Sequence, residues 1–90
     1  MSNETKEEKL IKEIIYSLVD KKEEVSIDIT LTGHTAVYDI RVADSDVGKV
    51  LGKKGGHAAA LRTIFSAIYG KMGKKLHLQV VDPRRSKSDK

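Results

Sequence analysis

The residues best suited to bind a charged ligand lie near the middle of the chain, in the run Gly52, Lys53, Lys54, Gly55 and Gly56. Glycine has no Cβ, so a phosphate backbone can approach the main chain closely at such a loop. The residues after it read as a helix, which places the free N–H groups of the loop at the positive end of a helix dipole. Together with the two lysines, the run predicts contact with a nucleic-acid strand. The alternative is two solvated lysines at an exposed turn.

Other phosphate-binding motifs do not fit the spacing of these glycines. The run from Gly48 to Lys54 has one residue too few for a P-loop and lacks the Ser or Thr that would hold magnesium. Gly52, Gly55 and Gly56 lack the Gly-x-Gly start of a dinucleotide fingerprint. The single Phe and the three Tyr are scattered, so the aromatic platform of other RNA-binding folds is missing.

The sequence gives little support for a catalytic or metal-binding site. His34, His57 and His77 have no metal-ligand spacing, and we interpret each as a surface histidine. There is no cysteine. Asp44 and Asp46 resemble a carboxylate pair, but helix capping explains them better. We therefore expect no enzyme activity, no catalytic residue, no metal, no cofactor and no small-molecule substrate.

The first half of the chain predicts a helix and a hairpin. Thr5 and Glu8 fit a capping box. Apolar residues then recur at the three- and four-residue spacing of one helix stripe: Leu10, Ile11, Ile14, Ile15, Leu18 and Val19. Alternation of apolar and polar residues over 25–31 and 36–42, with a turn at 32–35, predicts an antiparallel pair of strands.

The second half predicts two helices and a strand. Asp44 or Ser45 is expected to cap a short helix that Gly52 ends. The next helix, ended by Gly73, is expected to bury residues spaced three and four apart, namely Ala58, Leu61, Phe65, Ile68 and Met72. Alternation over 76–80 then predicts a last strand before Pro83.

The length and charge of the chain predict one small domain. We divide its 90 residues into a flexible N-terminus (1–7), a single domain (8–82) and a disordered basic tail (83–90). The net charge is +4, and the tail either strengthens RNA binding without sequence preference or only adds solubility. No apolar run is long enough to span a membrane, and no signal peptide is visible. A cytoplasmic location without membrane contact is the expectation.

This order of elements around a Gly-x-x-Gly loop resembles a KH domain of the type II topology, over residues 8–82. Residues 50–55 carry the signature of two aliphatic residues before Gly-x-x-Gly, and residues 58–63 resemble more specifically the bacterial single-KH KhpA family. The resemblance implies an α+β fold, with a three-stranded mixed sheet and three helices packed on one face. Gly56 and His57 depart from it, because KH domains often carry a basic residue and an Ile or Thr there.

The resemblance also implies a groove for about four nucleotides of single-stranded RNA. Backbone N–H groups near Lys54, Gly55 and Gly56 would meet phosphates, with Gly52 and Gly55 permitting the close approach. The side chains expected to supply charge are Lys53, Lys54, Lys49 and Arg62, with Arg41 a weaker candidate. Val47 and Val50 are expected to floor the groove. The alternatives are a solvated helix face for Lys49 and Arg62, and ordinary core packing for the two valines.

A second stripe on the last helix, formed by Ala60, Ile64 and Ala67, predicts a dimer interface. The alternative is a widened core face. The resemblance implies self-association and pairing with a second KH protein, KhpB (Jag). It also implies a role as an RNA chaperone linked to cell-wall homeostasis and cell length. The competing hypothesis for function is a protein-interaction module with weak or no RNA binding of its own.

Overall fold

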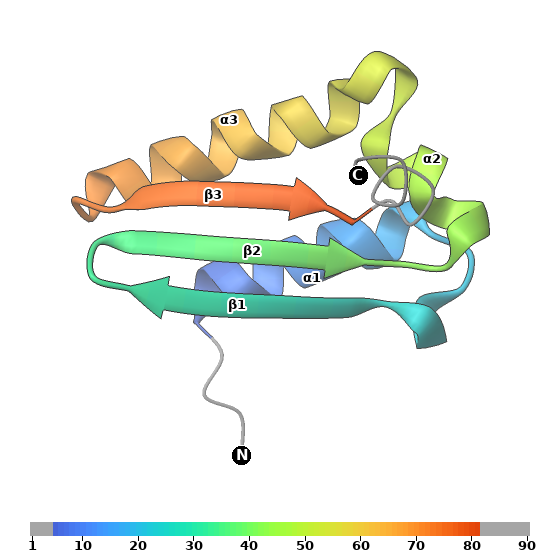
Figure 1. The fold of residues 1–90 in the computed structure, drawn as a ribbon, viewed down its shortest axis with the longest axis horizontal. Helices are drawn as coiled ribbons and strands as arrows, with labels where there is room; N and C mark the ends of the chain where they lie inside the picture. The colour runs from blue at the N-terminus through green and yellow to red at the C-terminus, as the bar shows by residue number, and fades with distance from the viewer. Residues whose placement is uncertain (1–4, 82–90) are drawn as a thin grey trace, which may run out of the picture.

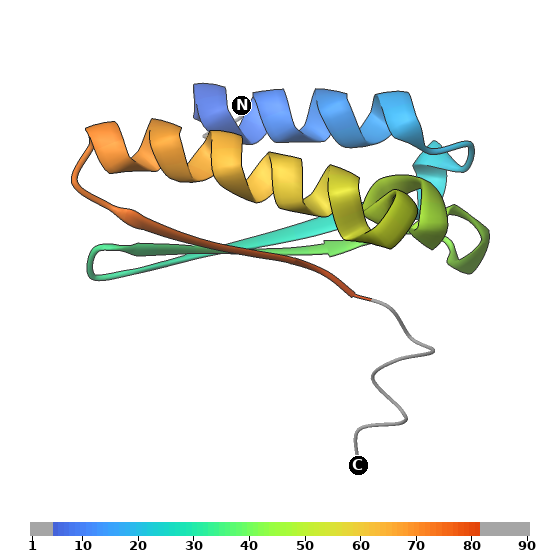
Figure 2. The ribbon, with the colours of Figure 1, turned by 90° about the horizontal axis from the view of Figure 1, so that it is seen from above.

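The protein forms a three-stranded sheet whose one face is covered by helices, and the computed structural model describes residues 5–81 (Figures 1 and 2). Along the chain the elements are α1 (Lys6–Leu18), β1 (Ser26–Thr32), β2 (Thr35–Arg41), α2 (Val47–Leu51), α3 (Gly56–Lys71) and β3 (Lys75–Val80). Short 3₁₀ turns lie at Lys22–Glu24, Asp44–Asp46 and Lys53–Gly55. The predicted α+β fold and its element order α-β-β-α-α-β are thereby confirmed.

The sheet is mixed, with the strand order β1-β2-β3 (Figure 1). β1 and β2 are antiparallel and form the predicted hairpin, with Thr32 opposite Thr35 and Gly33 in the turn at φ +57°. β2 and β3 are parallel, because the chain crosses over through α2 and α3 between them. Since side chains alternate along a strand, every second side chain of each strand points toward the helices.

The core lies between the sheet and the helix layer. Its largest fully buried apolar side chains come from α1 (Ile11, Ile15), β2 (Tyr38, Ile40), α2 (Val47, Val50) and α3 (Phe65). The hydroxyl groups of Tyr38 and Tyr69 form a buried hydrogen bond, and burial raises the pKa of Tyr38 above its ordinary value. The predicted apolar alternation on β2 and the predicted stripes on α1 and α3 together therefore account for most of this core.

The start of α1 lies earlier than the predicted domain boundary. The Thr5 side chain accepts a hydrogen bond from the Glu8 backbone N–H at 3.2 Å, as the capping box predicts, and the helix begins at Lys6. Lys6 and Glu7 therefore belong to the helix and not to a flexible segment 1–7. Residues 1–4 and the predicted tail 83–90 lie outside the described residues.

The end of α3 corrects one predicted core residue. Gly73, at φ +74°, ends the helix as predicted: its N–H donates to Gly70 O, and the Lys74 N–H donates to Tyr69 O. Because the helix stops at Lys71, Met72 leaves the buried stripe and is 46% exposed. Tyr69 is the residue that packs into the core at this end instead.

Among residues 5–81, no helix combines the length and the apolar character needed to cross a membrane.

Candidate nucleic-acid interface

The Gly-x-x-Gly loop connects α2 to α3 by a tight turn with unusual backbone angles. Gly52 has φ +77° and ψ 172°, a region that is essentially restricted to glycine. Lys54 and Gly55 follow in the left-handed region, at φ +56° and +75°. The Gly55 N–H closes the turn by donating to Gly52 O at 3.0 Å. Strain at Lys54, a residue with a Cβ, is thus stored at the tip of the loop.

The glycines of this region are glycine for different reasons. A Cβ on Gly52 would lie 2.5 Å from Cγ of His57 and 2.7 Å from its backbone N, so the fold itself requires glycine there. Gly48 and Gly56 adopt helical conformations, and a Cβ on either would meet nothing within 4 Å. The fold therefore does not require glycine at these two positions. Their bare backbone is a surface that an approaching ligand can use.

Replacing Gly52 with Ala should destabilise the domain by about 2–4 kcal/mol, from the forbidden backbone angles and the overlap with His57. Replacing Gly48 with Ala is the matched control and should leave stability unchanged or raise it by up to about 1 kcal/mol, since the position is helical and open. Denaturant unfolding of both variants measures the difference. Equal stabilities would show that Gly52 is not held by these constraints.

The loop is also electropositive. No side chain caps the N-terminus of α3, and its first turn contains no acidic residue. Lys53 and Lys54 are exposed, and neither forms an ion pair with any other residue of the part that the structure describes. The dipole of a 16-residue helix and two unneutralised cations therefore act at the same place. This is an arrangement that attracts an anion.

Lys49 is occupied by two carboxylates. Its Nζ forms ion pairs with Asp20 and with Asp46 Oδ1, the latter at 3.1 Å, and these pairs raise its pKa. Asp46 is fully buried and also accepts the Lys21 N–H at 2.9 Å. That bond lowers the pKa of Asp46 below its ordinary value against the opposing effect of burial. A phosphate would have to compete with Asp20 and Asp46 for Lys49.

The same contacts correct the predicted caps of α2. Asp46 occupies the N-cap position, yet its side chain makes no capping bond and instead ties the segment after α1 to the start of α2. Asp44 and Ser45 lie in the preceding 3₁₀ turn and do not cap α2 either. The prediction for Asp44 and Ser45 was wrong because the 3₁₀ turn places them before the N-cap position, and Asp46 does not cap because its carboxylate accepts the N–H of Lys21, 25 residues away.

Val47 and Val50 do not floor a groove. Both are 0% exposed, and Val50 belongs to the main core cluster. Of the two interpretations that the sequence left open, core packing is therefore correct for this structure. The apolar side chain of α2 that keeps some exposure is Leu51, which is half-buried directly before the loop.

The two arginines named as candidates, Arg41 and Arg62, lie on different faces. Arg62, on α3, donates from Nε to the Leu78 carbonyl at 2.9 Å. The N–H of Lys75 donates to His34 O, directly before β2, and the N–H of Val81 donates to Ile40 O on β2. Alternation along β3 therefore turns the Leu78 carbonyl toward the free edge of the sheet. Arg62 is therefore fixed at an open strand edge next to the helix that follows the loop. Arg41 follows the buried Ile40 on β2 and so lies on the opposite face of the sheet, away from the helices and the loop.

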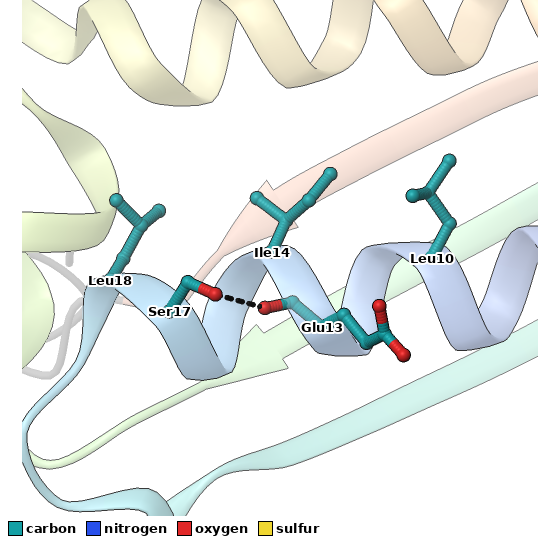
Figure 3. A pocket seen from close by; sticks show the side chains of 5 residues that line it. All are labelled: Leu10, Glu13, Ile14, Ser17 and Leu18. Carbon is teal, nitrogen blue, oxygen red and sulfur yellow. Dashed lines mark hydrogen bonds between the residues drawn. The ribbon is translucent and has the colours of Figure 1, made fainter.

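The predicted pairing stripe of α3 is accessible. Ala60, Ile64 and Ala67 are all exposed, and Ile64 is 53% exposed, so the alternative of a widened core face is excluded. A shallow apolar hollow lies along α1, where Leu10, Ile14 and Leu18 project on the side of α3 (Figure 3). The dimer interface itself stays a prediction.

Among residues 5–81, no group of three or more His, Asp or Glu side chains is placed to hold a metal ion.

The family model described as KhpA/KhpB, KH domain matches residues 8–80. The chain belongs to this KhpA/KhpB KH-domain family.

Relatives named RNA-binding protein KhpA resemble this chain over most of their own length. The protein from Borreliella burgdorferi is 37% identical over 73 residues, which are 81% of this chain and 89% of the relative. The protein from Listeria monocytogenes is 37% identical over 75 residues, 83% of this chain and 99% of the relative. The protein from Aquifex aeolicus is 42% identical over 65 residues, 72% and 82% of the two chains.

Sequence reasoning missed one residue of this KH-domain loop. His57 is exposed, as expected for a surface histidine, but its Nδ1 lies 2.8 Å from the Lys49 backbone O. It thereby binds the end of α2 to the start of α3 across the loop. Its place directly after Gly-x-x-Gly-Gly was visible in the sequence, but nothing there indicated a carbonyl eight residues earlier as its partner.

Proposed function

We propose that this chain binds single-stranded RNA through the α2–α3 loop. The observation that carries the proposal is the uncapped start of α3 beside Lys53 and Lys54, whose charges no described side chain neutralises. Gly56 supports it, since the fold does not need glycine there and the position leaves the backbone open. Membership of the KhpA/KhpB family, with relatives named RNA-binding proteins, points to the same ligand.

In this proposal the loop binds the sugar–phosphate backbone and recognises its negative charge, not the base sequence. The N–H groups of Gly55 and Gly56 already donate to Gly52 O and Lys53 O, so a phosphate shares or replaces these bonds and also accepts from the neighbouring N–H groups of Lys54 and the first turn of α3. Lys53 and Lys54 add long-range attraction. About four nucleotides occupy the groove beside the loop, which is the usual span of a KH domain. Arg62 contributes its remaining donors at the edge of β3. Lys49 joins only if a phosphate displaces a carboxylate, so we rank it below Lys53 and Lys54.

The biological role that we propose is that of an RNA chaperone and post-transcriptional regulator in the cytoplasm. It would act as a homodimer, or with a second KH protein of the KhpB (Jag) kind, in cell-wall homeostasis and the control of cell length. We propose no catalytic step, cofactor or small-molecule substrate. The tail 83–90 would add affinity without sequence preference, because it carries four basic residues and one acidic residue.

An amide-shift titration with a short single-stranded RNA tests the proposal. We expect the largest shifts over residues 52–57, with smaller ones at Arg62 and along β3. Gly56→Ala is the informative variant: it should fold as well as the wild type, because the position is helical and open, yet bind RNA several-fold more weakly. Shifts confined to the open face of the sheet, around Arg41, would contradict the proposal.

A second candidate function is a protein-interaction module that pairs through α3. The observation that favours it is the exposure of Ile64, a large apolar residue between the small residues Ala60 and Ala67 on one helix face. The two functions are compatible, and RNA binding ranks first because the loop geometry points to an anionic strand.

A further inference from the structure

The proposed function leaves one polar atom of the loop region without a role, namely Nε2 of His57. The imidazole lies against Gly52, whose missing Cβ makes room for the ring, and its Nδ1 is bonded to Lys49 O. The ring is therefore held between the end of α2 and the start of α3. It sits directly beside the segment where we place the RNA phosphates.

The hydrogen bond to Lys49 determines which ring nitrogen carries the proton. A backbone carbonyl oxygen only accepts hydrogen bonds, so Nδ1 must be the donor in this 2.8 Å contact. In a neutral imidazole the other nitrogen then has a lone pair and no proton. Nε2 of His57 is thus an acceptor, and no donor reaches it from the residues 5–81 that the structure describes.

An acceptor at this position selects among the groups of a nucleic-acid backbone. Phosphate oxygens only accept, so they gain nothing from a neutral Nε2. The ribose 2′-hydroxyl is a donor, it lies between successive phosphates, and it is the group that distinguishes RNA from DNA. Resting on the RNA binding proposed above, we propose that His57 accepts a hydrogen bond from a 2′-hydroxyl and makes the loop prefer RNA to DNA.

The test compares a short single-stranded RNA with the same sequence carrying 2′-fluoro riboses, which keep the sugar shape but lack the O–H donor. Binding is measured at about pH 8, where an imidazole side chain is ordinarily neutral. We expect the wild type to bind the RNA about 3- to 10-fold more tightly, the ratio that one net hydrogen bond provides. A deoxyribose strand should bind at least as weakly as the 2′-fluoro strand.

His57→Asn is the matched variant. The Asn side chain places an N–H donor near the position of Nδ1, so the bond to Lys49 O and the α2–α3 connection can be kept, while nothing replaces Nε2. We expect this variant to bind the 2′-fluoro strand as the wild type does and to lose the preference for RNA. Denaturant unfolding checks that the variant is folded.

Nitrogen NMR of the wild-type imidazole gives a readout that needs no variant: we expect a protonated Nδ1 and an unprotonated Nε2. A proton on Nε2 alone would overturn the inference. Equal binding of RNA and the 2′-fluoro strand by the wild type, or an RNA preference kept by folded His57→Asn, would overturn it too, with the proposed function intact. Failure of every strand to bind would overturn the proposed function as well.

Discussion

A chain carrying Lys53→Asp and Lys54→Asp is expected to remain folded and to lose RNA binding. Both side chains are exposed, neither has an ion-pair partner within residues 5–81, and the flanking glycines that shape the turn are kept. Asp is also better tolerated than most residues in the left-handed conformation of Lys54. Two phosphate contacts are lost and two repulsions gained, so the affinity should fall by roughly tenfold to a thousandfold at low salt.

The control is the double variant Lys71→Asp and Lys75→Asp, which changes the net charge equally at the end of α3 and the start of β3, away from the loop. It should weaken binding only slightly, through the general charge of the protein. Fluorescence anisotropy with a labelled RNA at two salt concentrations measures both variants. Undiminished binding by the folded loop variant would remove the loop from the mechanism, and an equal loss in the control would show that only net charge matters.

The second large effect is expected at Ile64. If the stripe Ala60, Ile64 and Ala67 is an interface, Ile64→Asp buries a carboxylate between two helices. An unpaired buried carboxylate opposes association by several kcal/mol, enough to dissociate a micromolar dimer. Because Ile64 is 53% exposed in the single chain, the variant should fold and run as a monomer in light scattering. Its loop should still bind RNA, though more weakly.

Ser66→Asp provides the comparison, since Ser66 is exposed on α3 but outside the stripe. It should leave the oligomeric state unchanged. If Ile64→Asp has the same oligomeric state as the wild type, the stripe is not an interface and Ile64 is simply a solvent-exposed residue. An unfolded Ile64→Asp variant would contradict the exposure of Ile64 in the structure.

Local patterns in the sequence were sufficient to predict the elements and the loop. The alternation on β2 and the three- and four-residue spacing on α1 and α3 reflect one-sided burial, which leaves a periodic trace in any sequence. Thr5 and Gly73 act on neighbours within a few residues, so their capping roles were also predictable. The Gly-x-x-Gly run with its two lysines marked the candidate site because glycine at a turn is a local requirement.

The tertiary structure alone decided what covers each face and which charges are already paired. Periodicity shows that Val47 and Val50 face something apolar, but only the folded chain shows that they face the core. Lys49 is less available to a ligand because it pairs with Asp20, 29 residues earlier in the chain, and no local pattern reports such a contact. His57 gains its hydrogen-bond partner, the Lys49 carbonyl, across a turn whose angles arise only on folding. Periodicity shows that a face is buried, but which distant segments meet there depends on how helices and strands pack against one another, and no local pattern specifies that.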